Sequence, residues 1–179
     1  MATDADLLRS SASADFDTFV ERHRDAVWRY AARRLGPTDA DEIVNDVFLT
    51  VHRRRGRYDP TRPDARPWLF GIATNMIRRH RRAEVRALRA LAASGIDPVA
   101  PDEPLDRVAF SAEIATVLAT MRPRQRDVLF LYGVAGLTLD EIALATDAPV
   151  GTVKSLLHRA RAHAVKYLDA DTATGGELV

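Results

Sequence analysis

The chain has 179 residues, of which 46% are hydrophobic, so it can bury the core of one ordinary domain or of two small ones. It has no cysteine, which excludes disulfides, thiolate metal sites and a cysteine nucleophile. No apolar run approaches membrane-spanning length, and residues 1–15 lack a signal-peptide pattern, so we expect a cytoplasmic protein without membrane insertion.

Charge is segregated along the chain, although the net charge is only +1. Residues 37–46 hold four acids and no lysine or arginine, whereas residues 53–89 hold twelve arginines against three acids. Such blocks favour two partners, one of them a polyanion, but a charged face is often merely solvated. Nearly all cations are arginine, which suits bidentate phosphate contact, but a GC-rich genome produces the same bias.

A first amphipathic helix is predicted over residues 16–35, where apolar side chains recur at steps of three and four. Gly36, which a proline follows, should end this helix. Thr38 and Asp41 resemble a capping box, which would open a second helix. The buried stripe of the second helix falls within residues 43–51.

A third helix should follow a loop over residues 58–67, which holds three prolines and has no periodicity. Pro67 suits the first helical position, residues 68–77 supply an apolar side, and an arginine run over 78–82 comes after it. Glycine, proline and acids then replace the apolar pattern over residues 94–104, which predicts a flexible linker. Its slack lets the two halves lie at different separations, so something else must fix their spacing.

The remainder of the chain is again helical and no β-hairpin signal occurs in the sequence, so the predicted fold class is all-α. Thr138 and Glu141 form a second capping box, and residues 147–149 make a tight turn. The helices expected here span residues 105–120, 123–132, 139–146 and 150–168. The expected organisation is two small helical domains, 15–90 and 107–169, a linker over 91–106, a disordered N-terminal tail over 1–14 and a C-terminal tail over 170–179.

The last two helices, joined by a short turn, form either a plain αα-hairpin or a DNA-binding helix-turn-helix. The second helix favours DNA binding, because its apolar stripe leaves polar and basic side chains on the other faces. Such side chains can meet base edges and phosphates in the major groove. The candidates for this contact are Thr152, Lys154, Ser155 and Arg159.

Six sequence motifs stand in order along the chain, at residues 39–48, 67–75, 121–129, 136–143, 149–155 and 158–161. Together they resemble the extracytoplasmic-function (ECF) sigma factors of the sigma-70 family. DADEIVNDVF (39–48) looks like region 2.2, and PWLFGIATN (67–75) looks like regions 2.3 and 2.4. MRPRQRDVL (121–129), GLTLDEIA (136–143), PVGTVKS (149–155) and HRAR (158–161) look like region 4. The resemblance implies a sigma region 2 bundle in the first half and a region 4 helix-turn-helix in the second.

The resemblance also implies partners: the core RNA polymerase, through its β′ clamp helices and β flap, promoter DNA, and an anti-sigma factor. The residues implied to bind the polymerase core are Asp41, Glu42, Asn45 and Asp46. Those implied to contact the −10 element are Trp68, Asn75, Arg78, Arg79 and Arg82, although a tryptophan is often simply a core residue. The −35 element would meet the four candidates on the last helix.

Two positions depart from the resembled pattern. Many relatives carry arginine where this chain has Leu156, so this side chain faces either a thymine methyl or the core. Asp147 stands in the turn where relatives often have glycine, and aspartate tolerates a left-handed backbone better than most residues.

The sequence holds no catalytic constellation, no phosphate-binding glycine loop and no histidine set at metal-ligand spacing, so we expect no enzyme, no metal and no cofactor. Two other functions stay open at this point. A stand-alone helix-turn-helix regulator would bind duplex DNA without polymerase and would need a ligand pocket or receiver domain in the first half. A helical adaptor that does not bind DNA would leave the arginine run idle.

Overall fold

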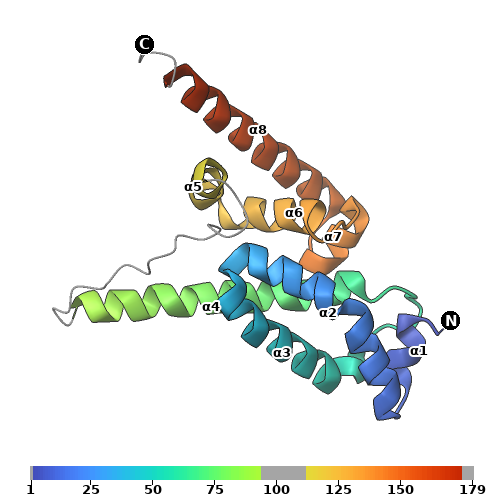
Figure 1. The fold of residues 1–179 in the computed structure, drawn as a ribbon. Helices are drawn as coiled ribbons and strands as arrows, with labels where there is room; N and C mark the ends of the chain where they lie inside the picture. Colours follow the sequence, from blue (N-terminus) through green and yellow to red (C-terminus); the bar gives the residue numbers. More distant parts are fainter. Residues whose placement is uncertain (1, 94–111, 175–179) are drawn as a thin grey trace.

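The computed structural model describes residues 2–93 and 112–174, and within these ranges the chain is helical without strands, as predicted (Figure 1). The first half comprises α1 (Asp4–Arg9), α2 (Ser13–Leu35), α3 (Pro37–Arg54), the 3-10 turn η1 (Arg55–Arg57) and α4 (Arg66–Ala93). The second half comprises α5 (Ala112–Thr120), α6 (Pro123–Gly133), α7 (Leu139–Thr146) and α8 (Val150–Thr174). Of the expected linker, residues 91–93 form the end of α4 and the rest lies outside the described residues. Residues 175–179 of the expected C-terminal tail also lie outside them.

The junction of α2 and α3 lies at Gly36, as the Gly-Pro pair predicts. Gly36 has a φ of 88°, a region in which residues with a Cβ are strained, and its amide donates to the Ala32 carbonyl. The capping box predicted at Thr38 is wrong. Pro37 already occupies the first turn of α3, so the helix begins earlier and Gly36 is its N-cap, without a side-chain cap.

The core of the first half lies between α2, α3 and α4, which pack against one another. Its fully buried side chains follow the predicted stripes and include Phe19, Val27, Val44, Val47, Leu69 and Ile77. Burying an aliphatic or aromatic side chain of this size contributes ~1.5–3 kcal/mol to folding. The hydrophobic pattern therefore determines how the three helices associate.

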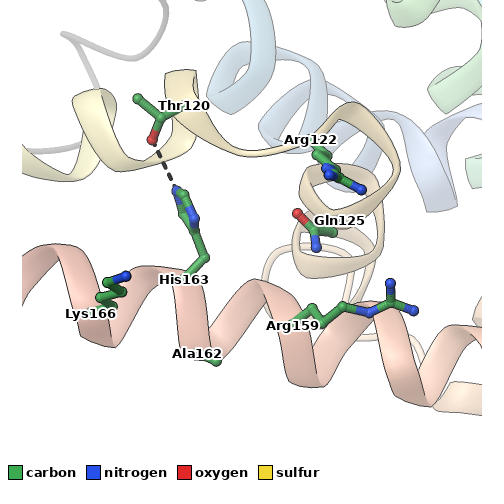
Figure 2. Close-up of a pocket in the computed structure, with 7 residues that line it drawn as sticks. All are labelled: Thr120, Arg122, Gln125, Arg159, Ala162, His163 and Lys166. Atoms are coloured by element: carbon green, nitrogen blue, oxygen red, sulfur yellow. Dashed lines mark hydrogen bonds between the residues drawn. The ribbon is translucent and has the colours of Figure 1, made fainter.

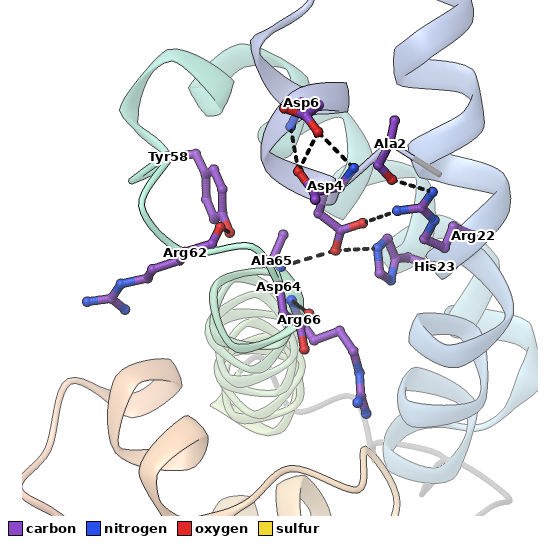
Figure 3. A network of polar contacts seen from close by, with 11 residues as sticks. Ala2, Asp4, Asp6, Arg22, His23, Tyr58, Arg62, Asp64, Ala65 and Arg66 are labelled. Atoms are coloured by element: carbon purple, nitrogen blue, oxygen red, sulfur yellow. Dashed lines mark hydrogen bonds and ion pairs between the residues drawn. The ribbon is translucent and has the colours of Figure 1, made fainter.

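Segment 1–14 was expected to be disordered, and this prediction is wrong for α1. Thr3 and Asp6 form a reciprocal capping box, and Leu7 and Leu8 are buried. Asp4 lies at the centre of the contact between α1 and the bundle (Figure 3). Its carboxylate accepts hydrogen bonds from Arg22 Nη1 at 2.7 Å, from His23 Nε2 at 2.9 Å and from the Ala65 amide at 3.1 Å.

The second half is a compact group in which α8 packs against α5, α6 and α7. The predicted capping box of α7 is confirmed, since Thr138 Oγ1 accepts from the Glu141 amide and Glu141 accepts from the Thr138 amide. Asp147 follows with a left-handed φ of 50°, as the turn requires. The buried stripe of α8 contains Val153 and Leu157, also as predicted.

The two halves pack directly against each other, which the sequence did not predict. Helix α4 packs against α7, and the pair makes one of the most extensive helix contacts of the described residues (Figure 1). A Cβ added at Gly71 of α4 would lie 2.6 Å from the Ala145 carbonyl oxygen of α7, so the contact depends on glycine at that position. We call this packing of α4 on α7 the closed arrangement.

Candidate nucleic-acid interface

The four −35 candidates lie on the exposed side of α8. Thr152, Lys154, Ser155 and Arg159 are all exposed, while Val153 and Leu157 on the opposite side are buried. Ser155 Oγ donates to the Gly151 carbonyl at 3.0 Å and Arg159 Nε donates to the Ser155 carbonyl at 3.2 Å. The helix thus presents polar and basic groups outward from a fixed backbone, as a recognition helix requires.

Leu156 turns toward the protein rather than away from it. Its side chain is half-buried and packs against the apolar core. Of the two interpretations left open by the sequence, the structure therefore favours packing over contact with a thymine methyl.

The −10 candidates on α4 fall into two groups. Asn75, Arg79 and Arg82 are exposed. Trp68 is half-buried, packs against the core and lies 5.3 Å from the Tyr58 ring, measured between ring centroids. Burial raises the pKa of Tyr58 to about 12, and its hydroxyl donates to the Arg62 carbonyl at 2.5 Å. Trp68 is thus held from one side by the fold, as expected for a core residue.

Arg78 differs from the other −10 candidates because it is already paired. Its Nε donates to Asp127 Oδ2 of the second half at 2.6 Å, and its side chain is one-third exposed. In the closed arrangement this candidate therefore contacts a carboxylate of its own chain.

The acidic candidates form one exposed face of α3. Asp41, Glu42, Asn45 and Asp46 are all exposed, and the opposite face of the helix is buried in the bundle. Asp41 Oδ1 accepts a hydrogen bond from Trp28 Nε1 at 3.1 Å, which fixes one end of this face. A partner with basic groups can reach the whole set without rearrangement of the helix.

A cavity of about 470 Å³ lies between the start of α6 and the middle of α8 (Figure 2). Three cationic side chains line it, with one polar wall made by Thr120, whose hydroxyl is 3.0 Å from His163 Nε2. The lining residues are Thr120, Arg122, Gln125, Arg159, Ala162, His163 and Lys166. Of these residues the sequence had indicated only Arg159: Thr120, Arg122 and Gln125 join it through the packing of α5 and α6 on α8, and the three further α8 residues carried no separate signal.

One cluster in the described part of the chain has the composition of a cation site. His80 Nε2 lies 3.4 Å from Asp39 Oδ2 and 3.7 Å from Glu84 Oε1, on the outside of the bundle. Ordinary ion pairing at a solvated surface accounts for this arrangement. Within the described ranges no helix is long and apolar enough to span a membrane.

Comparison with protein families assigns each half of the chain separately. The family model of Sigma-70 region 2 matches residues 19–87, and that of Sigma-70, region 4 matches residues 111–163. The RNA polymerase sigma factor CnrH of Cupriavidus metallidurans is 33% identical over 187 residues, which cover 94% of this chain and 97% of CnrH. The ECF RNA polymerase sigma factor SigE of Mycolicibacterium smegmatis is 29% identical over 168 residues; the match covers 88% of this chain but 63% of SigE.

Two solved structures share the arrangement of helices. CnrH in complex with the cytosolic domain of CnrY matches with a TM-score of 0.68 and 29% identity, covering 93% of this chain and 96% of that one. The sigma factor RpoE of Bartonella quintana, solved with the anti-sigma factor NepR, matches with a TM-score of 0.66 over 88% of this chain and 98% of its own. At 21% identity the second likeness establishes the fold alone.

Proposed function

Because the chain belongs to the sigma-70 family of RNA polymerase sigma factors, in its extracytoplasmic-function group, we propose that it binds core polymerase and directs initiation by reading −10 and −35 promoter elements. One observation carries the proposal. A single chain presents an exposed acidic face on α3, exposed basic and amide groups on α4, and a polar recognition face on α8.

The second half would read the −35 element through the major groove. Thr152, Lys154 and Ser155 lie near the start of α8, the end of a recognition helix that enters the groove. Arg159 and the cations of the adjoining cavity would contact phosphates, which position the helix on the duplex. Affinity from such contacts falls with rising salt concentration.

The first half would contact the −10 element through α4. Arg79 and Arg82 supply sequence-independent attraction to the DNA backbone. Asn75 is exposed beside them, and an amide can pair with a base edge. Trp68 stays a candidate only for its exposed edge, because the rest of the ring packs on the bundle.

The acidic face of α3 would dock on the β′ clamp helices of the polymerase, and the second half on the β flap. Charge complementarity of this kind guides and orients association. Nucleotide chemistry would then belong to the polymerase, so the chain would act in the cytoplasm as a binding factor without a catalytic site of its own.

An anti-sigma factor is proposed as a further partner. It is supported by the structure of CnrH, 29% identical to this chain, which was solved in complex with a protein partner, the cytosolic domain of CnrY. The alternative of a stand-alone regulator has no such support, since the first half that would hold its ligand or receiver domain matches sigma region 2 instead.

Co-purification with core polymerase tests the proposal. A tagged chain mixed with purified core should elute with it in size-exclusion chromatography at moderate salt. Elution of the two as separate species, with both correctly folded, would overturn the sigma-factor assignment of this chain.

A further inference from the structure

A buried carboxylate bridges the two halves of the chain. Asp127 of α6 has a side chain only 1% exposed, and each of its oxygens meets a different arginine of the first half. Oδ1 lies 2.5 Å from Arg34 Nη2 at the end of α2, and Oδ2 lies 2.6 Å from Arg78 Nε on α4. One acid thus fills the space between two arginines that come from separate helices.

The first half holds Arg34 in place by itself. Arg34 Nη1 donates to the Tyr30 hydroxyl at 3.2 Å, and that hydroxyl lies 2.7 Å from Thr74 Oγ1. Burial by itself lowers the pKa of Arg34, but the contacts with Tyr30 and Asp127 outweigh it and keep the guanidinium charged. Because Tyr30 and Thr74 both belong to the first half, the arginine keeps its hydrogen bond to Tyr30 when the halves separate.

We propose that Arg34 and Arg78 form a phosphate-binding site for the DNA backbone, and that Asp127 occupies this site in the closed arrangement. Closure and DNA contact at this site are then mutually exclusive. The proposal deepens the proposed function and rests on it. Arg78 is already a −10 candidate, whereas Arg34 is a new one.

The donors of the pair fit a phosphate at least as well as a carboxylate. Arginine binds both anions through paired N–H donors in one plane. Arg34 Nε has no hydrogen-bond partner among the described residues, so the carboxylate leaves a buried donor unused. A phosphodiester offers additional acceptor oxygens that can reach such a donor.

The contact between the two halves, which we call the joint, depends on charged groups and can therefore be released. When the halves part, the two arginines and Asp127 enter water, and hydration replaces most of the ion-pair energy that is lost. A joint of buried leucines would have no such compensation. The remaining contacts at the joint include Gly71 against Ala145 and a hydrogen bond from Arg66 Nη2 to the Ala135 carbonyl.

Interdomain distances test the closed arrangement. The chain has no cysteine, so Glu21→Cys and Ala119→Cys introduce a unique pair of exposed labelling sites in α2 and α5. Spin labels there should give one narrow distance distribution for the parent protein. Asp127→Asn removes the charge at nearly constant shape, so it should broaden the distance distribution and shift it to longer distances. Asp140→Asn, on the exposed side of α7, should leave the distribution unchanged.

A steric variant checks the same point without altering charge. Gly71→Ala places a methyl group against the Ala145 carbonyl and should open the joint. The stability of the helical bundle in the first half should not fall, because alanine is a better helix former than glycine. Gly133→Ala is the matched control, since a Cβ there meets nothing within 4 Å. Unchanged distances in both Asp127→Asn and Gly71→Ala, with full helicity by circular dichroism, would overturn the closed arrangement.

DNA binding tests the phosphate site. A mixed-sequence duplex is sufficient, because phosphate contacts do not depend on sequence. Gly71→Ala should bind it several-fold more tightly than the parent, since Asp127 no longer fills the site. In that open background, Arg34→Gln should weaken binding and reduce the slope of log affinity against log salt by ~1, whereas Arg29→Gln, exposed on α2, should change neither.

An unchanged affinity and slope for Arg34→Gln would overturn the phosphate site. These measurements use neither polymerase nor promoter. Failure of the chain to bind core polymerase would therefore reject the sigma function, and the spin-label distances and the salt dependence of DNA binding could still be interpreted.

Discussion

Leu156 stands on α8 at a position where the resembled pattern led us to expect arginine, and its side chain packs partly into the core of the second half. Leucine at this position therefore contributes apolar burial rather than a positive charge. Asp4 shows a similar dependence on surroundings. It is a charged residue in the first turn of a short helix, and three donors from elsewhere in the fold make it a structural anchor.

We expect Leu156→Arg to destabilise the second half and not to strengthen −35 binding. The guanidinium would have to leave the half-buried site, with loss of ~1 kcal/mol of apolar burial. Val165→Arg is the matched control, because Val165 lies on the same helix with 57% of its surface exposed. Urea unfolding of both variants measures how much stability each substitution costs. A gain in DNA affinity for Leu156→Arg at unchanged stability would contradict the inward packing of this side chain.

Asp4 makes stability depend on pH at the acid end. Burial alone raises the pKa of this carboxyl, but hydrogen bonds from His23 and the Ala65 amide outweigh it and lower the pKa from 3.8 to about 2. A lowered folded-state pKa means that the stabilisation is complete above about 3.8 and is lost as the pH falls toward 2.

We expect Asp4→Asn to be less stable than the parent at neutral pH. The difference in free energy of unfolding between the two proteins should become smaller below pH 3.8. Urea unfolding at a series of pH values checks this. Asp17→Asn, an exposed acid on α2, should follow the parent throughout. A difference in free energy of unfolding that stays constant down to pH 2 would show that Asp4 does not act through its charge.

At the scale of helices, local chemistry predicted much of the fold. The Thr138–Glu141 capping box and the left-handed Asp147 lie within a few residues of the groups they satisfy, so sequence alone reveals them. The period of apolar residues likewise predicted which side of α3 and of α8 is exposed. Thr38 misled the prediction because a neighbouring proline changed where α3 begins.

Features that depend on tertiary contact could not be predicted in this way. Helix α1 owes its place to Asp4, whose partner Ala65 lies 61 residues away. Asp127 meets arginines 49 and 93 residues earlier in the chain. Nothing in the local pattern around either acid distinguishes it from an ordinary solvated one.

The exposed acidic face of α3 leads to a prediction about the polymerase. We expect Asp46→Arg to weaken binding to core polymerase by at least several-fold, because it reverses one charge of a face that should meet basic groups. Asp17→Arg makes the same charge change on α2 and should have little effect. Surface plasmon resonance with immobilised core compares them, and equal affinities would reject α3 as the docking helix.

For the whole molecule, the structure joins two modules that the sequence presents as independent. The region 2 bundle and the region 4 helix-turn-helix pack together through α4 and α7, with a buried acid between two arginines. The polymerase would have to separate them for −10 and −35 elements to be read at once. The free chain and the chain on its polymerase should therefore differ in the distance between the halves.

The sigma function is tested most directly by mapping transcript starts on genomic DNA with core polymerase alone, with the chain alone and with both together. A sigma function predicts discrete starts only when both are present, preceded by two shared sequence elements at constant spacing. Starts that are the same with and without the chain would contradict it.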